Sequence, residues 1–149
     1  MKSIVELDIQ APCEEVAALF ADPANLPKWM RDLARYEPVQ GMQGTPGSSY
    51  RMVPRTGDMV FVATVLSQRL PDQVILRLDG KNIVVLVTDR FIATSPRSTR
   101  MVSEEEFRFT TLFSWLFGFV AQHSIRKAHR QHIESFKAFA EQRARPREP

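Results

Sequence analysis

Hydrophobic and polar residues alternate at the start of the chain. Val5, Leu7 and Ile9 fall on one side of an extended backbone, while Glu6 and Asp8 fall on the other side. A period of two is typical of a strand with one buried face. The pattern therefore predicts a strand over residues 3–10.

The next segment has the pattern of short helices separated by proline. Pro12 suits the first turn of a helix, where a missing amide hydrogen costs nothing, and apolar residues follow at helical spacing over residues 16–20. Asp-Pro at positions 22–23 ends this helix, because a residue before proline is pushed out of the helical region. We expect a second short helix that begins near Asn25 and carries Trp29.

Between residues 35 and 109, runs typical of strands alternate with turn residues rich in Gly, Pro, Asp and Ser. Connections this short predict antiparallel hairpins, since a parallel crossover needs a dozen or more residues. The expected strands are 35–40, 48–53, 59–70, 73–79, 82–94 and 99–109. Together with the first strand they make a seven-stranded antiparallel sheet.

From Thr110 to about Gln142 the pattern is helical, with two apolar stripes that point to nearly opposite sides. The first stripe contains Phe113, Leu116, Phe117 and Val120, and the second contains Ala121, Ile125, Ala128, His132, Phe136 and Phe139. One straight helix cannot bury both stripes against one sheet. We predict a bend near Gly118, with the second stripe packed in the concave face of the sheet. We expect residues 1–142 to form a single domain, followed by a disordered basic tail at 143–149.

The opening of the chain resembles a known superfamily. Ile-Gln-Ala-Pro-Cys-Glu-Glu-Val at positions 9–16, followed by Leu-Phe-Ala-Asp-Pro-Ala-Asn-Leu-Pro-Lys-Trp-Met at 19–30, is similar to the start of the SRPBCC (START-like) superfamily, particularly its polyketide cyclase/dehydrase branch. The expected order of elements also matches. This resemblance implies an α+β helix-grip fold, in which a curved antiparallel sheet wraps around the C-terminal helix and leaves a ligand cavity. The superfamily contains both enzymes and carriers, so other residues must indicate the chemistry.

The turn at residues 96–97 sets the expected register of the last two strands. A two-residue loop places Thr88 opposite Glu105 and Arg90 opposite Ser103 on one face of the sheet. The opposite face would bury Asp89 together with two glutamates, which favours the first register.

These four residues form the predicted polar patch. A charged pair on an apolar face is costly unless it is paired or functional, so we predict that Thr88, Arg90, Ser103 and Glu105 hold a ligand carbonyl or hydroxyl. Arg90 and Glu105 are the candidate catalytic residues. The alternative is a solvent-facing salt bridge at the rim, because a register error of one residue exchanges the two faces.

Aromatic and methionine side chains are the other candidates to line the cavity or its mouth, since they make adaptable apolar contacts. They are Trp29, Met30, Tyr50, Met52, Trp115, Phe117 and Phe119. His132 is either a proton donor in the cavity or a core histidine bonded to a backbone carbonyl. We expect no metal, because no third ligand accompanies His129 and His132, and no cofactor, because no nucleotide-binding motif is present.

The apolar segment from Leu112 to Val120 must be covered by something, since its side chains surround the helix axis. It is too short to span a membrane, which takes ~20 apolar residues. Three coverings remain open: the rest of the chain, a second subunit in a homodimer, or a lipid surface.

Composition narrows the functional classes. The chain has 149 residues, a formal charge of +3 and a pI near 9.4, and its basic residues gather toward the C-terminus. A charged helix face is usually solvated, so no nucleic-acid binding is expected. The single Cys13 excludes an intrachain disulfide. No secretory signal or transmembrane segment is recognised, so we expect a cytoplasmic protein.

These observations favour a soluble protein that binds or transports a hydrophobic small molecule, such as a polyketide-, lipid- or quinone-like compound. The alternative is a cofactor-free cyclase or dehydratase, similar to polyketide cyclases and aromatases, in which Arg90 and Glu105 guide proton transfer. A second alternative is a protein-interaction module of the same fold that uses the surface from Phe113 to Phe119.

Overall fold

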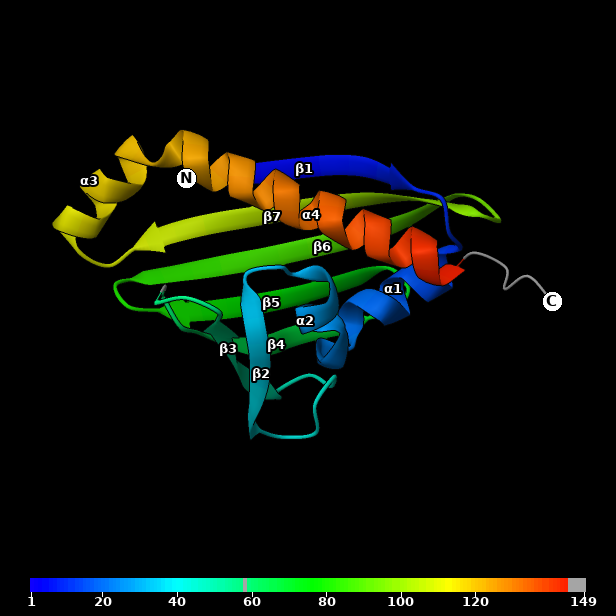
Figure 1. Ribbon diagram of the computed structural model, residues 1–149, viewed down its shortest axis with the longest axis horizontal. Helices are drawn as coiled ribbons and strands as arrows, with labels where there is room; N and C mark the ends of the chain where they lie inside the picture. Colours follow the sequence, from blue (N-terminus) through cyan, green and yellow to red (C-terminus); the bar gives the residue numbers. More distant parts are fainter. Residues whose placement is uncertain (58, 145–149) are drawn as a thin grey trace.

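A curved seven-stranded sheet with a long helix across its concave face makes up the protein (Figure 1). The computed structural model describes residues 1–57 and 59–144. The elements are β1 (Lys2–Ile9), α1 (Cys13–Ala21), the 3-10 helix η1 (Pro23–Asn25), α2 (Leu26–Trp29), β2 (Leu33–Gln40), β3 (Ser49–Pro54), β4 (Phe61–Arg69), β5 (Gln73–Gly80), β6 (Ile83–Ser95), β7 (Ser98–Phe109), α3 (Leu112–Val120) and α4 (Gln122–Ala144). No helix within these residues is long and apolar enough to cross a bilayer.

The order of strands in the sheet is β1-β7-β6-β5-β4-β3-β2, and each neighbouring pair is antiparallel. Six strands follow one another as hairpins, while β1 joins the far side of β7. This arrangement confirms the predicted α+β helix-grip fold, including the short helices that follow the first strand.

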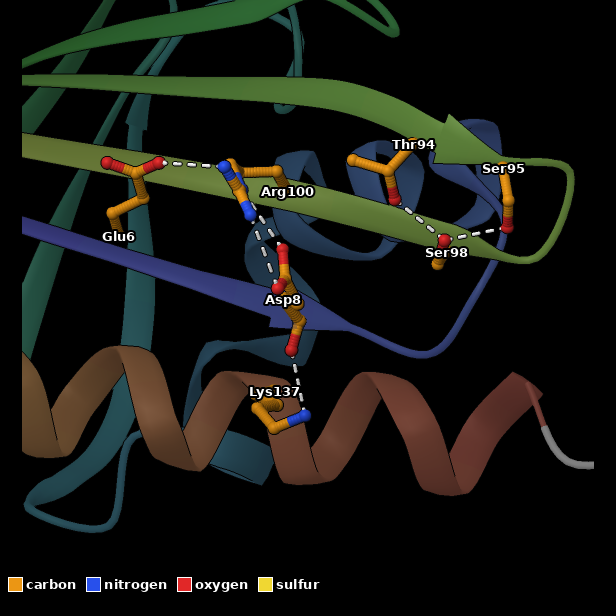
Figure 2. A network of polar contacts seen from close by, with 7 residues as sticks. All are labelled: Glu6, Asp8, Thr94, Ser95, Ser98, Arg100 and Lys137. Atoms are coloured by element: carbon orange, nitrogen blue, oxygen red, sulfur yellow. Dashed lines mark hydrogen bonds and ion pairs between the residues drawn. The ribbon is translucent and has the colours of Figure 1, made fainter.

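A β-bulge at Thr94 changes the register of β6 against β7. Ser95 pairs with Ser98 as predicted, but the next pair is Ala93 with Thr99, so Thr94 is an extra residue on β6. The hydroxyls of Thr94 and Ser95 both hydrogen bond to the Ser98 hydroxyl, at 2.7 and 2.6 Å (Figure 2). The hairpin therefore closes where it was expected, while the rest of β6 is displaced by one position.

This displacement reverses the predicted inner face of β6. Arg90 is exposed and Thr88 lies on the outer face, whereas Asp89 is fully buried and pairs with Ser103. The predicted pairs Thr88–Glu105 and Arg90–Ser103 are wrong, because a shift of one residue exchanges the two faces of a strand.

The C-terminal helical region breaks at Ala121, close to the predicted bend at Gly118, and divides into α3 and α4. Gly118 itself is buried within α3 for a different reason. A Cβ at this position would overlap the ring of Phe109, so the glycine allows α3 to approach the end of β7 closely.

The buried residues of α4 are His129, Ile133, Phe136 and Ala140. Only Phe136 belongs to the predicted stripe. The other buried positions each follow a predicted position by one residue, because the helix is turned about its axis to pack on β1 at the edge of the sheet as well. The Phe136 ring contacts those of Phe20 and Trp29, at centroid distances of 5.1 and 5.3 Å.

Polar contacts attach the C-terminal half of α4 to the β1 edge. Lys137 Nζ donates to the Asp8 carbonyl at 2.8 Å, and the Asp8 carboxylate pairs with Arg100 of β7 at 3.1 Å (Figure 2). The helix runs to Ala144, so it extends two residues into the predicted basic tail. The remaining tail residues, 145–149, lie outside the described part of the chain.

Candidate functional site

A cavity of about 320 Å³ lies between the sheet and the first turns of α4. Its wall is mostly apolar, with side chains that include Met30, Met52, Phe61, Leu78, Phe107 and Ile125. Among the described residues, the charged and ionisable side chains at this wall are Asp32, Glu105, His129 and His132. An apolar chamber with a few convergent polar groups is the usual form of a small-molecule site.

Three larger hollows are present in the described part of the chain. Two, of about 760 and 640 Å³, lie at the other end of the sheet around Pro12, and one of about 440 Å³ lies on the outer side of α4 next to Asp32 and His132. Their walls are more evenly polar and apolar, and neither Glu105 nor His129 lines any of them. The smaller cavity under α4 is therefore the better candidate for a functional site, despite its lower volume.

His129 is clamped between the two strands on which α4 rests. Its Nδ1 lies 2.8 Å from the hydroxyl of Ser3 on β1, and its Nε2 lies 2.9 Å from the hydroxyl of Ser103 on β7. Burial, with a further contribution from the charges of His132 and Arg130, lowers the pKa of His129 to about 4. The imidazole is therefore neutral at neutral pH and held in one orientation.

Glu105 projects from β7 toward the same place. Its Oε1 lies 3.7 Å from His129 Nε2, and its side chain is 21% exposed. Burial, and then the charge of Asp89, raise the pKa of Glu105 to about 8. At neutral pH most of this carboxyl group is protonated, so it presents an O–H donor to an apolar cavity.

Asp89 lies behind this wall, on the inner face of β6. It is fully buried, and neither carboxylate oxygen has a hydrogen-bond partner within the described part of the chain. Burial raises the pKa of Asp89 to about 7, and the neighbouring Ser103 hydroxyl acts in the opposite direction. Burial and the Asp89 charge also raise the pKa of Tyr50 well above its usual value.

His132 lies one turn further along α4, at the edge of the cavity. Its Nε2 is 3.8 Å from a carboxylate oxygen of Asp32. Burial lowers the pKa of His132, and Asp32 acts in the opposite direction. This histidine is therefore a partly exposed base beside an exposed carboxyl group.

The predicted site residues are divided among five places. Met30, Met52, Glu105 and His132 line the cavity, while Trp29 and Tyr50 belong to the packed core and Ser103 supports His129 from behind. Thr88 and Arg90 lie on the outer side of the sheet, because of the bulge at Thr94. Trp115, Phe117 and Phe119 are exposed on α3 and do not line the cavity.

The role of His129 was not predicted, since this residue was considered only as a possible metal ligand with His132. Its signal was present in the strands: Ser3 and Ser103 are small polar residues at buried positions on the inner faces of β1 and β7. Two such hydroxyls at buried positions require a polar partner, and α4 supplies it. Within the described residues, no group of three or more His, Cys, Asp or Glu side chains is arranged to hold a metal ion.

Solved structures with this fold are similar to the chain over nearly its whole length. The Zhui aromatase/cyclase from Streptomyces has a TM-score of 0.79 and 13% identity, covering 97% of this chain and 96% of its own. A START superfamily protein from Mycobacterium smegmatis has a TM-score of 0.73 and 15% identity, covering 96% of each chain. These identities establish a common fold alone.

A third solved structure has the same fold, and a family model matches the sequence. Norcoclaurine synthase from Thalictrum flavum, solved with dopamine and hydroxybenzaldehyde, has a TM-score of 0.71 and 12% identity over 98% of this chain and 90% of its own. No curated protein matches the sequence. The model of the polyketide cyclase/dehydrase and lipid transport family matches residues 2–141. The chain therefore belongs to the polyketide cyclase/dehydrase and lipid transport family.

Proposed function

We propose that this protein binds a hydrophobic small molecule that carries one polar group, a carbonyl or a hydroxyl, in the cavity under α4. The observation that carries the proposal is the apolar chamber with the protonated Glu105 carboxyl in its wall. A ligand carbonyl can accept a hydrogen bond from this carboxyl, and the apolar body of the ligand can contact the surrounding methionine and aromatic side chains.

The size and charge of the cavity restrict the ligand. A volume of about 320 Å³ is at the lower end of the range for small-molecule sites, which favours a compact ring or a short acyl chain. His129 and Glu105 are both largely neutral at neutral pH, so these two groups offer no charge to an ionic ligand. Membership in a family that includes lipid transport supports the same ligand class.

Native mass spectrometry of the purified protein, followed by organic extraction, tests this proposal. We expect a hydrophobic adduct at one molecule per chain. Ala128 lines the cavity from α4, so Ala128→Trp should fill the space and remove the adduct without unfolding the protein. Ala138→Trp, at an exposed position of the same helix that does not line this cavity, is the matched control and should retain the adduct. Retention by both variants would contradict binding in this cavity.

Acid–base chemistry without a cofactor is the second candidate function. It is favoured by a protonated carboxyl at Glu105 and a neutral base at His132 in the wall of the same cavity. Glu105 would donate a proton to a carbonyl oxygen as a ring closes, and His132 would accept one from the attacking carbon. Structural similarity to an aromatase/cyclase is compatible with such a reaction, although it shows only the fold.

Glu105→Gln distinguishes binding from catalysis. The amide retains the size and a hydrogen-bond donor, but it cannot transfer a proton. If the protein is an enzyme, turnover of a ring-forming polyketone should fall by about 10²-fold or more while its affinity stays nearly constant. An equal loss of turnover and affinity would contradict the catalytic role and leave a binding role for Glu105.

A further inference from the structure

Helix α3 exposes almost all of its apolar side chains. Leu112, Phe113, Leu116, Phe117 and Val120 are between 49% and 85% exposed. Gly118 is the one residue of this helix that is buried, against Phe109. Figure 1 shows α3 at one end of the molecule, turned away from the axis of α4. A contiguous apolar surface of this kind on a monomer usually marks an interaction site.

The helix is formed and held without burying this surface. Thr111 and Ser114 make a reciprocal capping box at its N-terminus, with the Ser114 amide donating to Thr111 Oγ1 at 3.1 Å. The rings of Trp115 and Phe119 stack on one another at the surface, with a centroid distance of 6.0 Å. The apolar side chains are thus presented on a preformed helix rather than on an unfolded segment.

The charges around α3 have one sign in the sequence. From Phe107 to Ile133 the chain contains no Asp or Glu, but it contains Arg108, Arg126, Lys127 and Arg130. Arg108 and Arg130 pair with Glu106 and Glu134, which lie just outside this segment. Arg126 and Lys127 are exposed on the first turns of α4, and no acidic side chain within the described residues forms an ion pair with either of them.

We infer that α3 docks the protein on an anionic lipid surface. Aromatic and aliphatic side chains next to basic residues are the combination that places a helix in the plane of the bilayer interface. With nine residues, α3 is about 14 Å long, so it lies in the interface instead of crossing the hydrocarbon. Arg126 and Lys127 would contact the lipid phosphates, and Trp115 suits the headgroup level.

The charges favour a lipid surface over a second copy of the chain. A symmetric dimer through α3 brings the same surface of both subunits together. Each subunit would then bring its own Arg126 and Lys127 to the contact, and the acid-free segment offers them no carboxylate to pair with. An anionic membrane supplies the missing negative charge.

Docking through α3 would also bring the candidate cavity close to the bilayer. Ile125 and Ala128, which line that cavity, lie in the first two turns of α4, directly after α3. A hydrophobic ligand would then travel a short distance between bilayer and protein. This last step rests on the proposed function, whereas the docking itself does not.

Co-sedimentation with vesicles tests the docking. We expect the protein to bind phosphatidylcholine vesicles that contain phosphatidylserine, and to bind weakly to pure phosphatidylcholine or at high salt. Phe117→Glu should weaken the partitioning by about tenfold or more, because burial of a phenylalanine is lost. Met42→Glu is the matched control, since Met42 is 76% exposed in the loop after β2, and it should bind like the wild type.

The basic residues have a test of their own. Arg126→Gln and Lys127→Gln should each weaken partitioning by about fivefold, as expected for one basic residue at an anionic surface. Arg97→Gln is the control, because Arg97 lies in the β6–β7 turn at the opposite end of the sheet (Figure 1). Brominated lipids should quench Trp115 and leave Trp29 emitting, since Trp29 is buried in the core.

Three results would overturn the inference. The first is a wild-type protein that stays in the supernatant with anionic vesicles at low salt. The second is a wild-type dimer by light scattering that Phe117→Glu converts to a monomer, because α3 would then be a subunit interface. The third is a loss of vesicle binding in Met42→Glu as large as the loss in Phe117→Glu. Cavity occupancy by mass spectrometry is independent of all three, so docking and ligand binding can fail separately.

Discussion

Asp89→Asn is the substitution whose effect on stability follows most directly from the structure. The Asp89 carboxyl is fully buried, and within the described residues neither of its oxygens is hydrogen bonded. Asparagine has nearly the same shape but carries no charge at any pH. The variant therefore removes the cost of a buried charge while it leaves the packing almost unchanged.

The magnitude follows from the pKa of Asp89, which rises from 3.8 to about 7 on folding. A carboxyl that is less acidic in the folded state binds its proton more tightly there, so the contribution of Asp89 to the free energy of unfolding is greatest below about pH 4. It falls as the pH rises to about 7, where the folded state must also lose the proton. At 1.36 kcal/mol per pH unit the total fall is ~4 kcal/mol, a large part of the stability of a small domain.

Urea unfolding followed by circular dichroism measures this difference across the pH range. Near pH 4 the two proteins should have nearly equal stability. Near pH 8 Asp89→Asn should be more stable by up to ~4 kcal/mol. The pKa of Glu105 should also fall in the variant, because the Asp89 charge is one cause of its high value. That second change is measurable by NMR titration of the Glu105 carboxyl carbon.

Glu15→Gln is the control for this experiment, since Glu15 is an exposed carboxylate on α1. Its stability should follow that of the wild type at every pH. If Asp89→Asn kept the same pH dependence as the wild type, or lost stability near pH 8, the argument from the buried charge would be refuted.

Two other substitutions test the packing around the site. Gly118→Ala should lower the melting temperature, because the new methyl group overlaps the ring of Phe109. This loss is expected although alanine is a better helix former than glycine by about 1 kcal/mol. Phe109→Ala in the same chain should restore the melting temperature. Ser103→Ala leaves His129 Nε2 without its hydroxyl partner and should cost about 1–3 kcal/mol in urea unfolding, whereas Ser98→Ala in the exposed hairpin should cost less than about 1 kcal/mol. Equal losses at the two serines would show that the buried contact with His129 contributes no more to stability than the exposed one.

The local pattern of the sequence determined the elements and their order. Alternation in β1, proline at positions 12 and 23, and the short turns between strands each act within a few residues, so they can be interpreted without the rest of the chain. The orientation of β7 was also predictable, because Met101 and Phe107 share a face with Glu105, whereas Glu104 and Glu106 share the opposite face. For this reason Glu105 was placed on the inner face correctly.

Tertiary contacts decided the rest of the site. The extra residue at Thr94 is held by a hydrogen bond to Ser98, and this one residue reverses the predicted face of every β6 side chain that precedes it. The rotation of α4 is set by strands at opposite ends of the sequence, since Ser3 and Ser103 both bond to His129. Periodicity reports which residues share a face, but it does not report the angle at which that face meets its neighbours. That angle depends on contacts between distant segments, and only the folded chain forms them.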